Sequence, residues 1–431
     1  MELNSIRITR LAVTAGLSFL AIESQAKDPL EIDVTNIGGG GVLQPVTGKS
    51  VPNLVEALIG GRDQFSLLQN TTFQANLRYA DVAQALNFSV SGGPGNWTVN
   101  LSTPFRPNLI SHQFNGSTKA DVEQQLTDYL KKDGSNDLAA LLKALNERSA
   151  FGVMTGNPNS TTALTAANNY AEYGTAPSQT KEEKATPKDA GGRVGLSMVG
   201  DAGFIDANGY KARSYSYTPF IPIKVASRVM LDVGIPLNYT EVEGSQVFRV
   251  GMELGARILL MKREYENGAV KQPWFWQVAP SGGSQVAGSV DLVAGGIVNN
   301  FGVTSLLAYD FGKFEISMGN HISAHESLEV TLGDYKFDPK VSTQIVKNGL
   351  KLGVPFSRRW YAEIYAIDTE LLGDAAFTTR YTTVGGGVGF KALGKPDAPT
   401  KKRGYLMVGA YSHIGEHYTS ANFQVGSGWK F

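Results

Sequence analysis

The chain has 431 residues, with 39 basic and 39 acidic side chains and no cysteine. This balance of charge gives no support to nucleic-acid binding or to a polybasic role at a membrane surface. Without cysteine, an exported form has no disulfide and must rely on core packing and strand hydrogen bonds. The chain holds 49 glycines and 10% aromatic residues, which suits strands that are half lipid-facing and half wet.

The first 26 residues have the pattern of a signal peptide. Arg7 and Arg10 precede the apolar run from Leu11 to Ile22, and Ser24 to Ala26 are typical of a cleavage site. We therefore expect residues 1–26 to be removed and the protein to be exported. The apolar run is too short for a membrane-spanning helix, and no later stretch of about 18 uncharged apolar residues exists. If the protein is integral to a membrane, it must cross as a closed β-barrel.

Residues 27–50 include Gly38 to Gly41 and are predicted to be a flexible N-terminus. Residues 51–173 show a mixed pattern, with a hairpin at Gly92 to Gly95 and a capping-box-like helix start at Thr118 and Asp121. This predicts a small α+β domain.

A second helix is expected in that domain, because leucines fall on one helical face. They are Leu138, Leu141, Leu142 and Leu145. Residues 174–192 are rich in Pro, Lys, Glu and Gly and are predicted to be a linker.

From residue 193 to 431 the hydrophobic period is two. In the segment from Val247 to Leu260, apolar residues such as Met252 and Leu254 alternate with polar ones such as Glu253. Segments of this kind predict about twelve strands of an all-β, transmembrane, antiparallel barrel. We expect each apolar face to meet lipid and each polar face to line the lumen.

An even strand count places both ends of the barrel on the periplasmic side. Longer loops are then expected outside, at residues 201–209, 326–341 and 370–379. Two periplasmic connections, residues 262–273 and 393–402, are longer than this scheme predicts.

Charged residues of both signs are predicted to face the lumen. They are Arg228, Asp232, Arg249, Glu253, Arg257, Glu315, Lys347, Lys351 and Glu363. A selective pore more often carries a ring of one sign, and a barrel of about twelve strands is narrow. The mixture therefore indicates a filled, salt-bridged lumen, with a substrate path as the alternative.

Four histidines form two pairs with a spacing of four residues: His321 with His325, and His413 with His417. In a strand both members share the lumen face, and we expect them near the outer rim. Four strand residues span about 13 Å, so one metal ion cannot bind both members of a pair. No metal and no cofactor are predicted.

The C-terminal segment alternates and ends on an aromatic residue, with Phe423, Val425, Trp429 and Phe431 on one face. This is typical of a wall-closing strand and of a signal for assembly. Outer-membrane lipid and the barrel-assembly machinery are the expected partners.

No enzyme is predicted, because the sequence has no nucleophile elbow, His-Glu-x-x-His motif or phosphate loop. Ser412 and His413 are neighbours on a strand and point to opposite faces, so they cannot act as a catalytic couple.

The layout of signal peptide, N-terminal region and C-terminal barrel resembles the autotransporter family of bacterial outer-membrane proteins. The segment before Arg193 departs from that family, which has a helix threaded through the pore, and residues 51–173 lack its long repetitive β-helix. The resemblance implies an outer-membrane barrel that anchors or translocates its N-terminal domain, which is periplasmic or surface-exposed. A narrow small-solute diffusion channel is the alternative.

Overall fold

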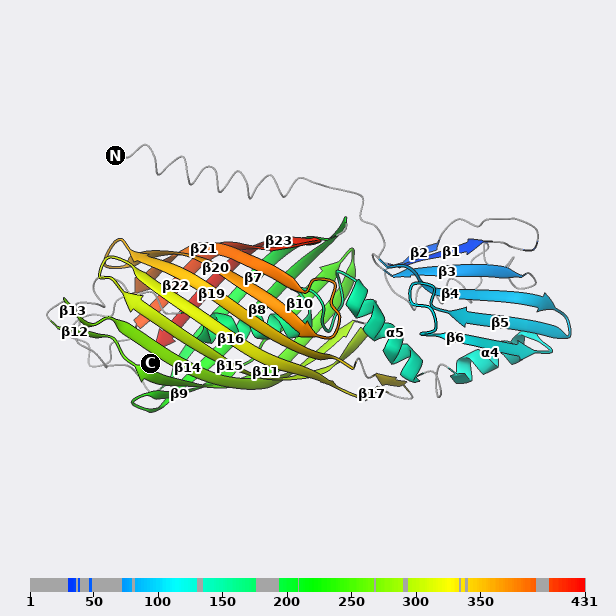
Figure 1. The fold of residues 1–431 in the computed structure, drawn as a ribbon, viewed down its shortest axis with the longest axis horizontal. Helices are drawn as coiled ribbons and strands as arrows, with labels where there is room; N and C mark the ends of the chain where they lie inside the picture. Colours follow the sequence, from blue (N-terminus) through cyan, green and yellow to red (C-terminus); the bar gives the residue numbers. More distant parts are fainter. Residues whose placement is uncertain are drawn as a thin grey trace, which may run out of the picture.

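The computed structural model describes residues 30–35, 38, 46–48, 72–79, 82–129, 135–175, 194–207, 209–266, 269–289, 294–332, 335–337, 340–392 and 403–430. Two parts lie end to end along the long axis, a barrel and a smaller N-terminal sheet with helices (Figure 1).

The N-terminal sheet has six antiparallel strands in the order β2-β1-β3-β4-β5-β6. They are β1 (Leu30–Thr35), β2 (Val46–Gly48), β3 (Phe73–Tyr79), β4 (Val82–Gly93), β5 (Asn96–Ser102) and β6 (Ser111–Gly116). The hairpin predicted at Gly92 to Gly95 is confirmed, since Gly93 pairs with Asn96.

The prediction that residues 27–50 are a flexible N-terminus is wrong for β1 and β2. Strand β1 pairs with β3 over six residues, and its alternating Ile32 and Val34 are buried in the core. A short strand with two buried β-branched side chains gains enough from pairing and burial to join the sheet.

Helix α4 (Lys119–Asp128) begins at the predicted cap. Thr118 and Asp121 form a complete capping box, and Asp121 also accepts a hydrogen bond from the Ser117 hydroxyl. These hydrogen bonds, that of Ser117 first, lower the pKa of the Asp121 carboxyl below its ordinary value. The second predicted helix is α5 (Ser135–Arg148), whose Leu141 and Leu145 are buried in the core.

Within the described residues the barrel is a closed, twelve-stranded antiparallel wall, as predicted. Its strands are β7 (Gly195–Ala207), β8 (Tyr210–Ala226), β9 (Val229–Gly234) with β10 (Leu237–Val242), β11 (Ser245–Met261), β14 (Trp274–Ser289), β15 (Ala294–Asp310), β16 (Glu315–Leu328), β19 (Ser342–Pro355), β20 (Trp360–Gly373), β21 (Arg380–Ala392), β22 (Arg403–Gly415) and β23 (Tyr418–Lys430). Strands β9 and β10 both pair with β8 and β11, so they are two halves of one wall strand. Strand β23 pairs with β7 and closes the barrel.

We name the two ends of the barrel by what lies there. At the terminal end β7 begins and β23 stops, and the hairpin of β12 (Glu264–Glu266) and β13 (Ala269–Gln272) lies in a connection there. At the domain end lie the N-terminal sheet and the hairpin of β17 (Val330–Leu332) and β18 (Tyr335–Phe337) (Figure 1).

The outer loop predicted at residues 201–209 is not a loop. Strand β7 continues to Ala207, which pairs with Tyr210 of β8. The polar residues that suggested a loop, Asp201 and Asp206, are held in register opposite Ser216 and Lys211. The expected asymmetry of loop length is therefore absent at this connection.

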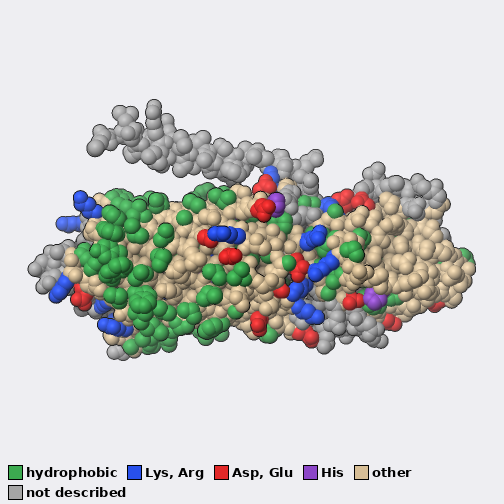
Figure 2. Space-filling model, in the orientation of Figure 1, with side chains coloured by type: hydrophobic (Ala, Val, Ile, Leu, Met, Phe, Trp, Pro, Cys, Tyr) green, Lys and Arg blue, Asp and Glu red, His purple; other side chains and the backbone are tan. Residues whose placement is uncertain are grey.

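The outer face of the barrel is apolar. Large side chains that are a third or more exposed occur on strand after strand, including Phe248 at 58%, Phe301 at 64% and Ile364 at 62%. On the face in view, Figure 2 shows hydrophobic side chains gathered toward the terminal end of the barrel. Near that end aromatic rings contact one another, as Trp274 does with Tyr309 and Trp360 with Phe390. An apolar belt edged by aromatic residues is the arrangement that a lipid bilayer requires of a barrel.

The N-terminal part packs onto the domain end of the barrel. One continuous core joins residues of the sheet to Ile205, Ala212 and Val247 of the barrel wall. Lys143 of α5 forms a 2.6 Å salt bridge to Asp374 in the connection after β20, and the Phe151 ring contacts that of Tyr210. The domain end is thus an interface within the molecule.

Candidate functional site: the lumen and its internal helix

Helix α6 (Thr161–Tyr173) contacts β14, β15, β16 and β19 from within the barrel. The prediction placed residues 51–173 in one α+β domain, and the structure differs because α6 lies in the lumen. Its side chains are mostly small, and Ala163 and Ala166 are completely buried. Small residues let a helix fit the narrow interior of a twelve-stranded barrel.

The wall makes room for the larger side chains of α6 with glycine. The Tyr170 ring lies against Gly319 and Gly349, and the Tyr173 hydroxyl lies against Gly255. A Cβ atom at any of these three glycines would overlap the tyrosine. The Tyr170 hydroxyl also donates a 3.3 Å hydrogen bond to the Gly319 carbonyl. The helix is therefore seated in a surface shaped for it.

An ion-pair cluster joins the C-terminal turn of α6 to the wall. The guanidinium of Arg257 lies 3.2 Å from the Glu172 carboxylate and forms two hydrogen bonds to Asp232. Asp232 is 1% exposed. One arginine thus pairs with two carboxylates in a buried site, where an unpaired charge is costly.

Two more predicted lumen residues hold α6 and the segment before it. Arg249 donates hydrogen bonds to the Thr161 hydroxyl at 3.1 Å and to the Val153 carbonyl at 3.4 Å. Glu253 is fully buried and accepts a 2.9 Å hydrogen bond from Asn300 and a 3.5 Å one from Asn169 of α6. These contacts tie α6 to the wall near its middle and its start.

Other predicted lumen charges are paired along the wall. Lys351 and Glu363 lie on neighbouring strands with 3.2 Å between charged atoms. Glu315 forms a salt bridge with Arg263, a residue in the β11–β12 connection that the strand pattern could not assign. Lys347 is buried and donates hydrogen bonds to Thr369 and Tyr381.

Arg228 differs from the prediction, because it lies in the exposed turn between β8 and β9 at the mouth of the lumen. The alternation of β9 begins one residue later, at Val229.

The histidines do not form a rim. His321 and His325 are buried inside the barrel, where His321 contacts the Thr304 hydroxyl at 2.8 Å. His413 also points inward and contacts Thr383 at 2.8 Å. His417 is exposed in the turn after β22. The expected pairing on one face fails for His413 and His417 because the strand ends between them, at Gly415.

Of the four C-terminal signal residues, Phe423 and Val425 lie on the outer face, at 50% and 49% exposure. The backbone of Trp429 pairs with Leu196 of β7. Phe431 lies outside the described residues.

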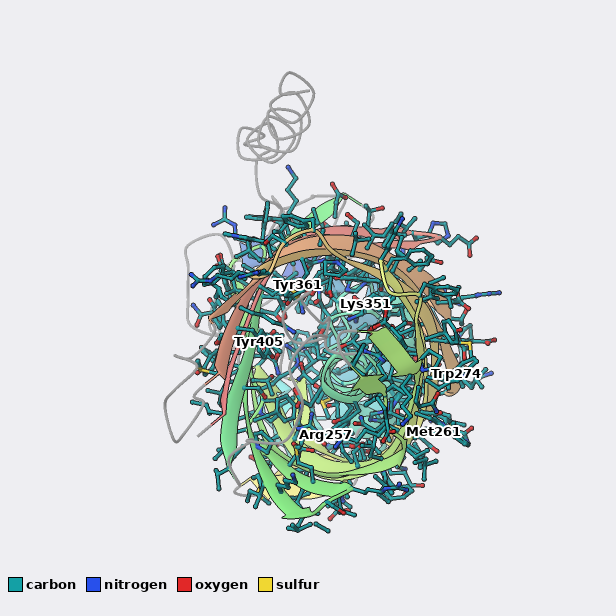
Figure 3. All side chains as sticks on the ribbon, turned by 90° about the vertical axis from the view of Figure 1, so that its left-hand side faces the viewer. Arg257, Met261, Trp274, Lys351, Tyr361 and Tyr405 are labelled. Atoms are coloured by element: carbon teal, nitrogen blue, oxygen red, sulfur yellow. The ribbon has the colours of Figure 1, made fainter. Side chains whose placement is uncertain are left out.

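The lumen has a cavity of about 640 Å³ on the side of α6 toward the terminal end. Its lining is rich in tyrosine, including Tyr361, Tyr365, Tyr405 and Tyr411. Figure 3 looks from the terminal end and shows Arg257, Lys351, Tyr361 and Tyr405 inside the ring of strands. Met261 and Trp274 lie on its outer side.

The domain end of the lumen is filled. Residues 149–160 are almost all buried, and Thr155 contacts Thr343 of β19 at 3.1 Å. Asn159 donates a 2.7 Å hydrogen bond to Tyr418 of β23. Residues 149–160 and α6 together fill the lumen from the domain end inward.

No helix among the described residues is long and apolar enough to span a bilayer. In the same part of the chain, no group of three or more His, Cys, Asp or Glu side chains is placed to hold a metal ion.

No family model matches the chain, and no curated protein matches it. Solved structures that resemble this chain include autotransporter domains and outer-membrane channels. The translocator domain of the autotransporter NalP from Neisseria meningitidis is 15% identical, with a TM-score of 0.42, over 63% of this chain and 96% of that one. The β domain of the Bordetella autotransporter Brka is 13% identical, with a TM-score of 0.37, over 56% of this chain and 100% of that one. The COG4313 outer-membrane channel from Pseudomonas putida F1 is 12% identical, with a TM-score of 0.37, over 57% of this chain and 98% of that one. The comparison includes translocators and channels, so it does not choose between these roles.

Proposed function

We propose that the protein is an integral outer-membrane barrel that anchors its N-terminal domain, and that the domain end of the barrel faces outward. The observation that carries this proposal is the path of the chain. The N-terminal domain packs on one end of the barrel, α6 lies in the lumen, and the wall begins at the opposite end.

The apolar belt supports the membrane location. Its side chains would expose a continuous apolar surface to water in a soluble protein. The sidedness follows from the usual arrangement of bacterial barrels with an even strand count, in which both barrel termini are periplasmic. The N-terminal domain then lies outside, connected to the terminal end through the lumen.

Cysteine labelling in intact cells tests this arrangement, because the chain has no cysteine of its own. Ser91 is exposed on the N-terminal sheet, and Ser227 is exposed in a turn at the terminal end. We expect a membrane-impermeant maleimide to label Ser91→Cys in intact cells. Ser227→Cys should be labelled only after the outer membrane is permeabilised.

The reverse pattern would place the N-terminal domain in the periplasm and contradict the surface anchor. Heat-modifiable migration of both variants on gels serves as the control for folding. A lack of heat-modifiable protein in the outer-membrane fraction would contradict the membrane barrel itself.

A small-solute channel is the second candidate, favoured by the cavity of about 640 Å³. Solute passage would require α6 and residues 149–160 to move, because both are bound to the wall. The contacts of α6 therefore favour the anchor over an open channel.

A further inference from the structure

Basic side chains gather at the terminal end of the barrel. Arg228 lies in the β8–β9 turn, Lys313 in the β15–β16 turn, and Arg358 and Arg359 in the β19–β20 turn, and all four are exposed. These turns are distributed around the circumference of the barrel. We call these four residues the basic rim, and Figure 2 shows Lys and Arg side chains at this end.

The basic rim borders the aromatic edge of the apolar belt. Lys313 lies in the same turn as Phe311 and Phe314, whose rings stack at 4.7 Å. Arg359 directly precedes Trp360, which contacts Phe390. Aromatic residues of this kind mark the depth of lipid headgroups. Lys313 and Arg359 are therefore placed at the phosphate level of the bilayer, just beyond the aromatic rings.

The domain end has a different charge. Among the described residues, its exposed acidic side chains are Asp206, Glu326, Glu329, Glu370 and Glu416, and its exposed basic side chains include Arg213, Lys340 and Arg380. Arg380 donates two hydrogen bonds to the Asp368 carboxylate. At the terminal end, Glu264 is the exposed acidic residue among those described. The protein is thus electrically asymmetric along the barrel axis.

We propose that the basic rim binds the headgroups of anionic phospholipids in the leaflet that meets the terminal end. Arginine and lysine bind phosphate through charge-assisted hydrogen bonds, and an anionic membrane surface attracts each nearby cation. The rim thereby fixes the depth of the barrel at that leaflet. This inference rests on the proposed membrane location, and the experiment below separates the two.

The tryptophans at the aromatic edge provide the probe. Trp274, Trp276 and Trp360 lie on the outer face near the rim, so brominated lipids in contact with them quench their fluorescence. The full chain is folded into phosphatidylcholine vesicles that contain either brominated phosphatidylcholine or brominated phosphatidylglycerol. Arg358→Gln/Arg359→Gln is compared with the native chain. Arg148→Gln/Arg213→Gln removes the same charge from α5 and β8, away from the rim, and is the matched control.

We expect the native chain and the control to prefer phosphatidylglycerol at low salt. The rim variant loses two cations and should lose about 5-fold to 25-fold of that preference, since each cation contributes a factor of up to about 5. High salt should remove the preference, because screening shortens the range of the interaction to a few ångströms.

Equal quenching of the native chain by both lipids would overturn the inference, as would a rim variant that keeps the full preference. If brominated phosphatidylcholine also fails to quench the fluorescence of the native chain, the outer face does not contact lipid. That result would contradict the proposed membrane location as well.

Discussion

Leu254 and Glu253 are neighbours in β11 with opposite surroundings. Leu254 is 50% exposed on the outer face, whereas Glu253 is fully buried and hydrogen-bonded to Asn300. This contrast is the alternation of a strand with lipid on one side and a filled lumen on the other. This contrast determines how much a substitution at each position lowers the free energy of unfolding.

A charge introduced on the outer face should destabilise the barrel strongly. We expect Leu254→Arg to lower the free energy of unfolding by about 2 to 4 kcal/mol, because the guanidinium would lie near the middle of the apolar belt. Gln277→Arg is the matched control, since Gln277 lines the cavity of the lumen. Unfolding titrations with denaturant in vesicles measure both, and equal costs would refute the assignment of faces.

A second residue-scale prediction concerns the fit between tyrosine and glycine. A Cβ atom at Gly389 would overlap the buried Tyr361 ring, whereas one at Gly288 would have no neighbour within 4 Å. We expect Gly389→Ala to lower the free energy of unfolding by about 1 to 3 kcal/mol through overpacking. Gly288→Ala should leave the free energy of unfolding nearly unchanged. Denaturant midpoints of the two variants in detergent provide the measurement. A Gly389→Ala variant as stable as the native chain would show that the ring moves freely.

At the scale of elements, the wall strands were predictable and the position of α6 was not. The alternation of β11 is local, so the sequence from Val247 to Leu260 is sufficient to read it. Helix α6 lacks a strong apolar stripe, and its binding depends on distant partners: Tyr170 meets Gly319, and Asn169 meets Glu253. Contacts of such long range leave no periodic signal.

The same reasoning explains the other differences. The family resemblance implies a pore helix directly before the barrel, where the Pro and Gly of residues 174–192 disfavour a helix, whereas α6 ends at Tyr173. The mixed sign of the predicted lumen charges was informative, since Asp232 with Arg257 and Lys351 with Glu363 are ion pairs. Their partners from outside the strands, Glu172 and Arg263, required the structure.

The attachment of α6 can be tested through its ion pairs. Arg257→Gln leaves both Glu172 and Asp232 without their cation and should cost about 3 to 5 kcal/mol, as breaking a buried pair does. Glu172→Gln should cost less, because Arg257 keeps its two hydrogen bonds to Asp232. A double-mutant cycle, measured by unfolding in detergent, should yield a coupling energy between positions 172 and 257. Additive effects would mean that the cluster does not hold the helix.

At the scale of the whole molecule, one chain builds both the wall and its filling. Residues 149–160 close the domain end, and α6 continues inward to a cavity on the side of the terminal end. The predicted lumen charges on the wall strands are bound by this filling, by other charges or by wall hydroxyls, as Lys347 is by those of Thr369 and Tyr381. The molecule therefore has no need of a separate plug, and its N-terminal domain is fixed to the barrel by the segment that fills the lumen.

This arrangement predicts that the full-length protein conducts poorly. Single-channel recording in planar bilayers should show low conductance for the full chain and a clear increase for a chain that begins just before β7. Arg257→Gln should give intermittent openings if α6 then leaves the lumen part of the time, while Arg148→Gln, distant from the lumen contacts, should behave like the native chain. Large, stable conductance of the full-length protein would contradict the filled lumen and favour the channel over the anchor.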